Sequence, residues 1–218
     1  MQKFLYIVFS LMVTLIFTSF NSETKLMKWN LEKSKNGIIV YSFLPEGERI
    51  KQIKVHSTVK GTLSAAVSVL KDVKNYPLWI YNCENSEIIT QKTHLEMEYY
   101  TQSKTPWPLQ NRDLVVSNRI YQDKAKKVHS ISMPLLNKIP EKDNLVRITD
   151  FYGEWIFTPL TDNEIAIDYY LKVDPAGTVP SWILNMVIDV GPYQTMENFV
   201  TMLQQTHHQK ATFSFIKN

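Results

Sequence analysis

Two pairs of oppositely charged residues offer the most specific polar chemistry in this sequence. Arg112 directly precedes Asp113, and Arg147 lies three residues before Asp150. For Arg112 and Asp113 we favour a structural ion pair at a strand start, because local pairs commonly have only that role. In the functional alternative, one of the two residues orients a polar group of a ligand. Arg147 and Asp150 form a second polar pair, and an inward-pointing Arg147 would need a ligand partner because buried charges require one.

The sequence gives only weak indications of catalytic residues. The only cysteine, Cys83, has no histidine beside it in the sequence, so we interpret it as a small buried hydrophobe rather than a nucleophile. Glu96 and Glu98 share a strand face and could serve acid–base catalysis. Their alternation with apolar residues favours a solvated outer face instead.

A metal site would most naturally use His207 and His208. Adjacent residues of a helix point about 100° apart, unlike the i, i+4 pairs that converge on an ion. The sequence also supplies no clear third ligand. We therefore predict no metal site and no cofactor.

Composition excludes several classes of function. The chain has 218 residues, 44% of them hydrophobic and 21% charged, which is the balance of one ordinary globular domain. Its formal net charge of +3 is too small to indicate a nucleic-acid partner. The six glycines form no phosphate-binding loop, and one cysteine cannot form an internal disulfide.

The first 22 residues resemble a targeting segment. Lys3 precedes an apolar run over residues 4–20, and polar residues follow it. This is the pattern of a secretory signal peptide, although 17 apolar residues lie at the lower limit for an uncleaved membrane anchor. We expect residues 1–22 to be one of these two and residues 23–218 to form the domain. The domain would then be exported, to the periplasm or to another extracytoplasmic site at a membrane.

Hydrophobic periodicity predicts the elements that position these side chains. Residues 38–43 and 50–59 predict strands, and Thr62 is a candidate N-cap for a short helix that follows. From residue 87 to 173 the apolar period becomes two, which indicates successive strands of an antiparallel sheet. Within this region we expect one long strand over 145–159.

Three further features complete the predicted elements. Gly153 suggests a bulge in the long strand. Residues 105–109 contain two prolines and predict a rigid loop, on which Trp107 and Leu109 either cap the core or contact a bilayer. A long helix follows residue 178, kinked at Gly191 and Pro192. Its apolar stripe packs in the core and comprises Trp182, Ile183, Met186, Val187 and Val190.

Four dispersed pieces of sequence, in this order and on these elements, resemble one family. They are Leu70, Lys71 and Asp72 with Trp79; residues 106–113, PWPLQNRD; residues 153–159, GEWIFTP; and residues 174–177, DPAG, with Pro180, Trp182, Asn185 and Pro192. The chain resembles the START domain, the steroidogenic-acute-regulatory-related lipid-transfer family. The resemblance implies an α+β helix-grip fold, in which a curved antiparallel sheet wraps around a long C-terminal helix, with short helices after the third strand.

The same resemblance implies a cavity that holds one lipid or similar hydrophobic ligand, for transfer or sensing. Candidate ligand-binding residues are then Arg112, Arg147, Asp150, Trp107, Leu109 and the stripe of the last helix. We expect transient membrane contact, no nucleic acid and a monomer. Two alternatives stay open: a cyclase-like or hydrolase-like enzyme using the same cavity, and a sensor or scaffold controlled by lipid. The sequence does not choose between sterol, hopanoid, phospholipid, carotenoid and fatty acid.

Overall fold

The computed structural model describes residues 28–180, 188 and 190–217. Strands are the main regular structure in this part of the chain. They are β1 (Asn30–Lys35), β2 (Ile38–Phe43), β3 (Gln52–Lys60), β4 (Cys83–Gln91), β5 (Glu96–Ser103), β6 (Asn111–Gln122), β7 (Val128–Pro134), β8 (Leu145–Arg147), β9 (Phe151–Thr161) and β10 (Glu164–Val173). The helical elements are α2 (Leu63–Lys71), the 3-10 helix η1 (Val73–Leu78), α4 (Gly191–Leu203) and α5 (Thr206–Gln209).

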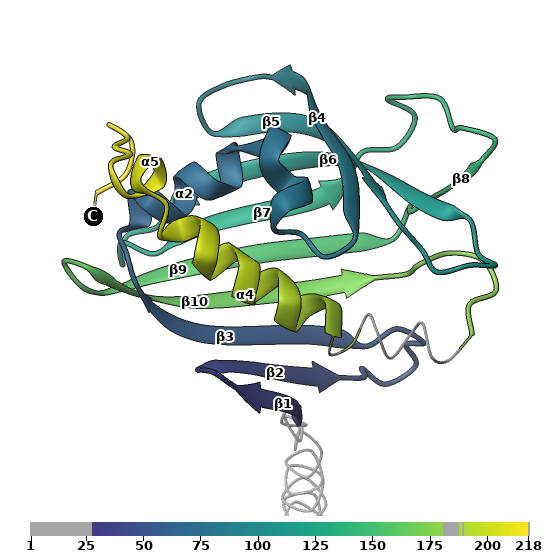
Figure 1. Ribbon diagram of the computed structural model, residues 1–218, viewed down its shortest axis with the longest axis horizontal. Helices are drawn as coiled ribbons and strands as arrows, with labels where there is room; N and C mark the ends of the chain where they lie inside the picture. The colour runs from purple at the N-terminus through teal and green to yellow at the C-terminus, as the bar shows by residue number, and fades with distance from the viewer. Residues whose placement is uncertain (1–27, 181–187, 189, 218) are drawn as a thin grey trace, which may run out of the picture.

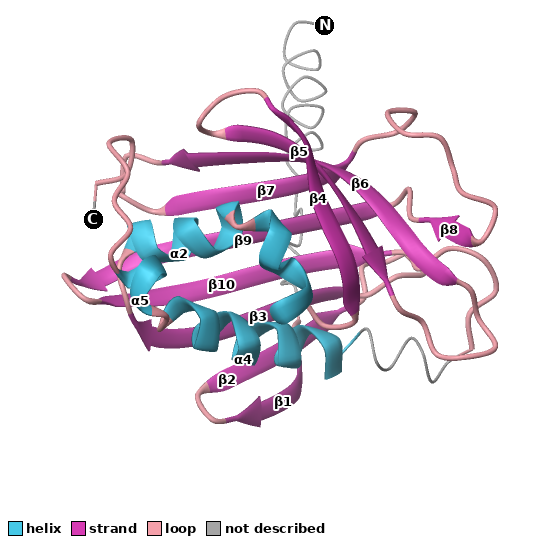
Figure 2. Ribbon diagram, turned by 45° about the horizontal axis from the view of Figure 1, so that its top comes forward, coloured by secondary structure: helices cyan, strands magenta, loops and turns pink. Residues whose placement is uncertain are grey.

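The strands form one sheet in the order β1-β2-β3-β10-β9-β7-β6-β5-β4, with β8 added in parallel beside β6. All neighbours along that path are antiparallel. The sheet curves around α4, which packs over β2 and β3, while α2 and α5 lie at one end of the same face (Figures 1 and 2). The sheet and the helices thus form two layers, with the hydrophobic core between them.

Strict alternation of apolar and polar residues produces the central hairpin. In β10, Ile165 and Ile167 are buried, opposite Pro159 and Phe157 of β9. The successive strands predicted up to residue 173 are confirmed here, because β10 ends at Val173. Strand β2 coincides with the predicted residues 38–43.

The sequence also predicts correctly where the first helix begins. The Thr62 hydroxyl accepts a hydrogen bond from the backbone N–H of Ala65 at 3.1 Å, which satisfies a donor that the helix itself leaves free. The apolar face of α2 is buried against the sheet and α4. Pro77 lies beyond Asp72 in the separate helix η1. Proline would break α2 if it lay in its interior, because it lacks the N–H that the helix needs.

The single strand predicted over residues 145–159 is wrong. Strand β8 pairs with β6, whereas β9 begins at Phe151 and pairs with β7 and β10. Between them, the Ile148 N–H donates to the Asp113 carbonyl, and the Asp174 N–H donates to the Asp150 carbonyl. The chain therefore changes partners at residues 148–150, a tertiary choice that local periodicity does not encode.

Gly153 does not form the predicted bulge, because the register from Phe151 to Pro159 against β10 is continuous. A β-carbon at Gly153 would lie 3.0 Å from the Phe151 ring. The glycine therefore provides space for that ring inside the sheet.

The outer face of β5 is also less solvated than the sequence predicts. Glu98 is only 2% exposed and forms ion pairs with Lys92 and with Lys138, the latter at 3.0 Å. The connection between β7 and β8 accounts for this burial, because it places Lys138 and Lys142 against Glu98 and Tyr100 of β5. The interpretation of Glu98 as a solvated carboxylate is wrong.

The last long helix is described from Gly191 onward. Met196, Phe199 and Leu203 of α4 are completely buried. Pro192 lies in the first turn of α4, where its missing N–H costs no hydrogen bond. The predicted kink also depends on residues 181–187 and 189, which lie outside the described residues, as do residues 1–22. Within the described ranges, no helix is long and apolar enough to span a bilayer.

Candidate functional site

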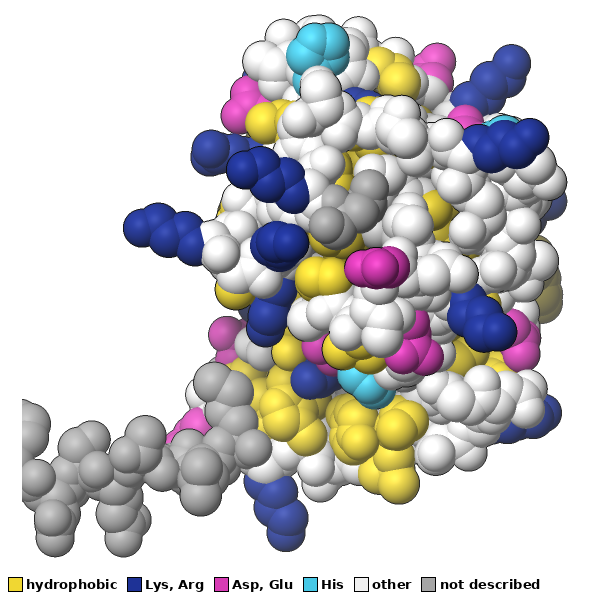
Figure 3. All heavy atoms as spheres, turned by 90° about the vertical axis from the view of Figure 1, so that its left-hand side faces the viewer, with side chains coloured by type: hydrophobic (Ala, Val, Ile, Leu, Met, Phe, Trp, Pro, Cys, Tyr) yellow, Lys and Arg dark blue, Asp and Glu magenta, His cyan; other side chains and the backbone are white. Residues whose placement is uncertain are grey.

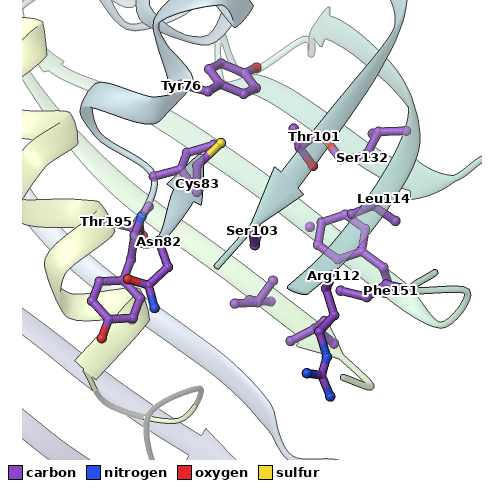
Figure 4. Close-up of a pocket in the computed structure, with 18 of the residues that line it drawn as sticks. Tyr76, Asn82, Cys83, Thr101, Ser103, Arg112, Leu114, Ser132, Phe151 and Thr195 are labelled. Carbon is purple, nitrogen blue, oxygen red and sulfur yellow. Dashed lines mark hydrogen bonds between the residues drawn. The ribbon is translucent and has the colours of Figure 1, made fainter. Parts of the chain in front are cut away.

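A cavity of about 270 Å³ lies between the concave face of the sheet, η1 and the start of α4. Alternate residues of β6 face it, because side chains of a strand point to opposite faces in turn. These residues are Arg112, Leu114, Val116 and Asn118. Figure 4 shows Cys83, Asn82 and Thr195 on one side of the cavity, with Leu114 and Phe151 on the other.

Aromatic side chains form much of the wall. Trp155 stacks on Tyr169 with ring centroids 4.1 Å apart and meets Trp79 edge-on at 5.9 Å. Phe199 of α4 packs against both tryptophans and so holds the helix to the sheet. Such a wall suits a hydrophobic ligand with a few polar groups, because recognition sites for small molecules are generally built this way.

One part of the cavity is polar. The Asn118 amide nitrogen donates to Ser130 Oγ at 2.9 Å and to Ser132 Oγ at 3.0 Å, and the Tyr99 hydroxyl lies 3.4 Å from Ser132 Oγ. Burial raises the pKa of Tyr99 to about 12, so its hydroxyl stays protonated. We call Tyr99, Asn118, Ser130 and Ser132 the polar cluster.

The polar cluster has unused hydrogen-bonding capacity. Asn118 Oδ1 is buried and has no hydrogen-bond partner, and the same is true of Trp79 Nε1 elsewhere in the wall. An unpaired buried polar atom costs about 1–3 kcal/mol. A hydroxyl or amide of a ligand that donates to Asn118 Oδ1 would remove that cost.

Arg112 lies about 20 Å from Asn118 along β6, at the other end of the cavity. It is buried, and its guanidinium donates to the carbonyls of Gln110 at 2.6 Å and Pro175 at 3.1 Å. The favoured Arg112–Asp113 ion pair is therefore wrong: neighbouring strand residues point to opposite faces. Arg112 instead connects the start of β6 to the segment that follows β10.

Asp113 pairs with Arg147. Arg147 Nε lies 2.8 Å from Asp113 Oδ1, and Arg147 also donates to the carbonyls of Ile139 and Pro140. Asp150 contacts Lys172 at 3.5 Å and is largely exposed. The predicted Arg147–Asp150 pair is thus wrong. Neither residue is among the described residues that line the cavity, and their contact with a ligand stays a prediction.

The proline-rich loop lies beside the cavity. Lys104, Thr105 and Pro106 line the cavity, whereas Trp107, the next residue, is 90% exposed. Leu109 is half-buried, and its N–H donates to the Pro106 carbonyl at 3.1 Å. The loop thus carries an exposed tryptophan at the edge of the cavity.

The other predicted contacts come from the last helix. Val190 is 37% exposed at the N-terminus of α4. Trp182, Ile183, Met186 and Val187 lie outside the described residues. From α4, Gly191, Pro192 and Thr195 line the cavity.

Comparison with known proteins agrees with this architecture. The family model of the START domain matches residues 21–210. The chain belongs to the START domain family. This confirms the resemblance found in the sequence, and the fold class as an α+β helix-grip.

Relatives and solved structures extend the match. The chain is 24% identical over 187 residues to the mouse phosphatidylcholine transfer protein, covering 82% of this chain and 85% of that protein. The crystal structure of a STAR-related lipid transfer protein from Xanthomonas axonopodis has a TM-score of 0.75 and 26% identity, covering 81% of this chain and 99% of the other. Human StAR-related lipid transfer protein 5 has a TM-score of 0.73 at 16% identity, covering 94% and 97%, and so shows the shared fold alone.

The START domain thus contains an apolar cavity with polar groups that the sequence analysis did not select. Asn118 lies on the same strand face as Val116 and Ile120, and this alternation could have identified it as a buried amide. Ser130 and Ser132 share one face of β7 in the same way.

Proposed function

We propose that this START domain binds one lipid, or a similar hydrophobic molecule, in the cavity and carries it between membranes outside the cytoplasm. The observation that carries the proposal is an aromatic-walled cavity with an unpartnered amide oxygen at Asn118. An acyl chain in water costs about 0.8 kcal/mol for each CH₂ group. A closed apolar cavity removes that cost, so transport needs neither a nucleophile nor a cofactor.

The names of several relatives support transfer rather than catalysis. An enzyme would need acid–base groups that converge on one point of the cavity. Arg147 and Asp150, the pair that the sequence suggested, instead form separate ion pairs with Asp113 and Lys172. Binding and release are therefore the activity we assign, with lipid sensing as a variant of the same activity.

Ligand exchange requires an opening from the cavity to the surface. The proline-rich loop and Pro175 line the Arg112 end of the cavity, because the Thr105 N–H donates to Asn111 Oδ1 and Arg112 Nε donates to the Pro175 carbonyl. We propose that this end opens at a membrane surface, with Trp107 as its interfacial contact, because tryptophan favours the boundary between lipid and water.

Vesicle experiments test the proposal. The purified chain is incubated with vesicles of mixed bacterial lipids, separated from them and extracted, and the lipids are identified by mass spectrometry. We expect one class of lipid at close to one molecule per chain, and transfer of that lipid from donor to acceptor vesicles. An empty extract together with no transfer would refute the proposal.

A matched pair of tryptophan substitutions controls for non-specific adsorption. Ser103 lines the cavity, and Ser103→Trp should fill it and abolish lipid recovery. Ser34 is exposed on β1, and Ser34→Trp should leave recovery unchanged. Equal recovery from both variants would place the bound lipid outside the cavity.

The cellular location is proposed from the first 22 residues. Fractionation of the host cells should place the chain in the periplasm or in the membrane fraction. A chain that begins near residue 23 would indicate cleavage, and an intact chain in membranes would indicate an anchor. Recovery of the intact chain in the cytoplasm would contradict export.

A further inference from the structure

A second cluster of polar side chains lies on the helices, separate from the cavity. Asp72 at the C-terminus of α2 and the neighbouring His207 and His208 of α5 bring their ligand atoms within 4.8 Å of one another. The two imidazole centroids are 3.9 Å apart. The expectation that adjacent histidines diverge is therefore wrong here, because α5 is a single short turn and Asp72 reaches them from another element.

An unpaired nitrogen of His208 indicates that this cluster binds a ligand. It is 1% exposed, and its Nε2 atom is buried without a hydrogen-bond partner. The nearest acid is the Asp72 carboxylate, 3.9 Å from Nε2, which is too far for a hydrogen bond. A buried imidazole nitrogen with nothing to bind is costly, and a cation between His208 and Asp72 would use it.

The surroundings of the cluster hold two of its side chains in place. Metal-bound histidines normally use their second nitrogen to hold a neighbouring group, which fixes the ring. His208 Nδ1 lies 2.9 Å from Ser68 Oγ. The Asp72 carboxylate is held in turn by Asn75 Nδ2 at 2.7 Å. Two of the three candidate ligands are thus oriented by other side chains of α2 and η1.

We propose that Asp72, His207 and His208 bind a divalent transition-metal ion, Zn²⁺ in the first instance. Two imidazoles and one carboxylate are a ligand set that zinc accepts, with water in the fourth position. Zinc–ligand distances of about 2.0–2.2 Å require the three atoms to approach more closely than 4.8 Å. His207 is exposed, so its side chain is free to rotate inward.

Such an ion would join the end of α2 to α5. The two helices already pack together, and α5 has only four residues. A metal bound on both sides of this contact would hold the C-terminal segment in place, and binding would add to the free energy of unfolding. The site is therefore structural in effect and independent of the occupant of the cavity.

Calorimetric titration of the full chain with zinc chloride tests the site. The chain carries no polyhistidine tag and is first stripped with a chelator. We expect one Zn²⁺ per chain, a higher melting temperature with zinc, and reversal by the chelator. Co²⁺ should give the intense visible absorption of a four-coordinate ion. Absence of stoichiometric zinc binding would overturn the proposal.

Two variants test the ligand assignment, and a third is the control. His207→Ala and Asp72→Asn should each weaken zinc binding about tenfold or more, as loss of even an orienting contact commonly does. Both residues are partly or fully exposed, so the variants should fold, which circular dichroism without zinc verifies. The matched control is His94→Ala, an exposed histidine outside the cluster. Unchanged zinc affinity in His207→Ala and Asp72→Asn, or an equal loss in His94→Ala, would refute the assignment.

Discussion

Asn118 has the clearest chemical requirement of any single residue in the cavity. Its amide nitrogen is fully used by Ser130 and Ser132, while its oxygen has no partner. The preferred ligand should therefore present a hydrogen-bond donor to Asn118 Oδ1 and an apolar body towards Trp155. A ligand with only acceptors there would leave Asn118 unsatisfied, and it should bind more weakly by about 1–3 kcal/mol.

Cys83 provides a reporter for the interior of the cavity. Burial raises the pKa of its thiol to about 11, so at pH 8 the thiolate is roughly a hundredfold scarcer than for a free cysteine. We expect iodoacetamide to react slowly at neutral pH and faster as the pH approaches 11, because the thiolate is the reactive form. The labelling rate is followed by intact mass, and bound lipid should lower it further.

The denatured chain serves as the control, since its Cys83 should react at the rate of free cysteine. Rapid labelling of the native chain at neutral pH would contradict the interpretation of Cys83 as an inert buried thiol.

Asp113 and Arg147 should contribute to the stability of the folded chain. Their side chains are 1% and 6% exposed, respectively. Asp113→Ala leaves the Arg147 guanidinium buried without a carboxylate, which should cost about 3–5 kcal/mol in the free energy of unfolding. Urea denaturation at pH 7 measures this loss. The exposed ion pair provides the comparison: Asp150→Ala should cost less than about 1 kcal/mol. Equal losses in the two variants would contradict a structural role for the Asp113–Arg147 pair.

These residues show what local sequence can and cannot reveal. Alternation along β6 predicts that Arg112 and Asn118 share a face with Leu114 and Val116, which is how the structure places them. It does not predict that Asp113 pairs with Arg147, because that contact depends on the parallel pairing of β8 with β6. A residue's face is therefore a local property, whereas its partner depends on topology.

At the scale of elements, the clearest functional prediction from the sequence is that the proline-rich loop contacts a bilayer. Pro106 borders the cavity while Trp107 is almost fully exposed. If the loop contacts membranes, Trp107→Ala should slow lipid transfer by roughly tenfold, since losing about 1.4 kcal/mol of membrane contact is a factor of ten. The amount of lipid bound at equilibrium should not change. Transfer of a fluorescent lipid between vesicles gives the rate.

Two comparisons distinguish membrane contact from a general loss of hydrophobic surface. Trp107→Phe should restore most of the rate. Leu160→Ala removes an exposed apolar side chain of β9 and should have no effect. An equal slowing by Leu160→Ala, or a normal rate for Trp107→Ala, would exclude the loop as the contact.

Elements with strong local signals were predictable, and those that depend on their partners were not. Thr62 begins α2 through its own hydrogen bond, so the sequence reveals that boundary. The separation of β8 from β9, and the burial of Glu98 beneath the β7–β8 connection, require knowledge of which strands meet. Strand β1 was missed because its largely exposed residues carry no apolar alternation.

At the scale of the molecule, the cavity and the core are made from the same side chains. Trp79, Trp155 and Phe199 connect η1, β9 and α4 and also form or support the wall of the cavity. The sheet cannot close more tightly on α4 without filling the cavity, so the empty chain forgoes contacts that a densely packed domain would make. A lipid in the cavity should therefore act as part of the core.

Ligand occupancy should accordingly be visible as stability of the whole domain. A lipid at one hundred times its Kd adds about 2.7 kcal/mol to the free energy of unfolding, because it binds only the folded chain. For a domain of this size that corresponds to a rise of roughly 5–10 °C in Tm. Calorimetry of delipidated and reloaded protein measures the rise. Ser103→Trp should show none, because its side chain occupies the cavity, whereas Ser34→Trp should respond like the unmodified chain. A rise of equal size in Ser103→Trp would mean that lipid stabilises the domain from its outer surface, and the cavity would lose its assignment as the binding site.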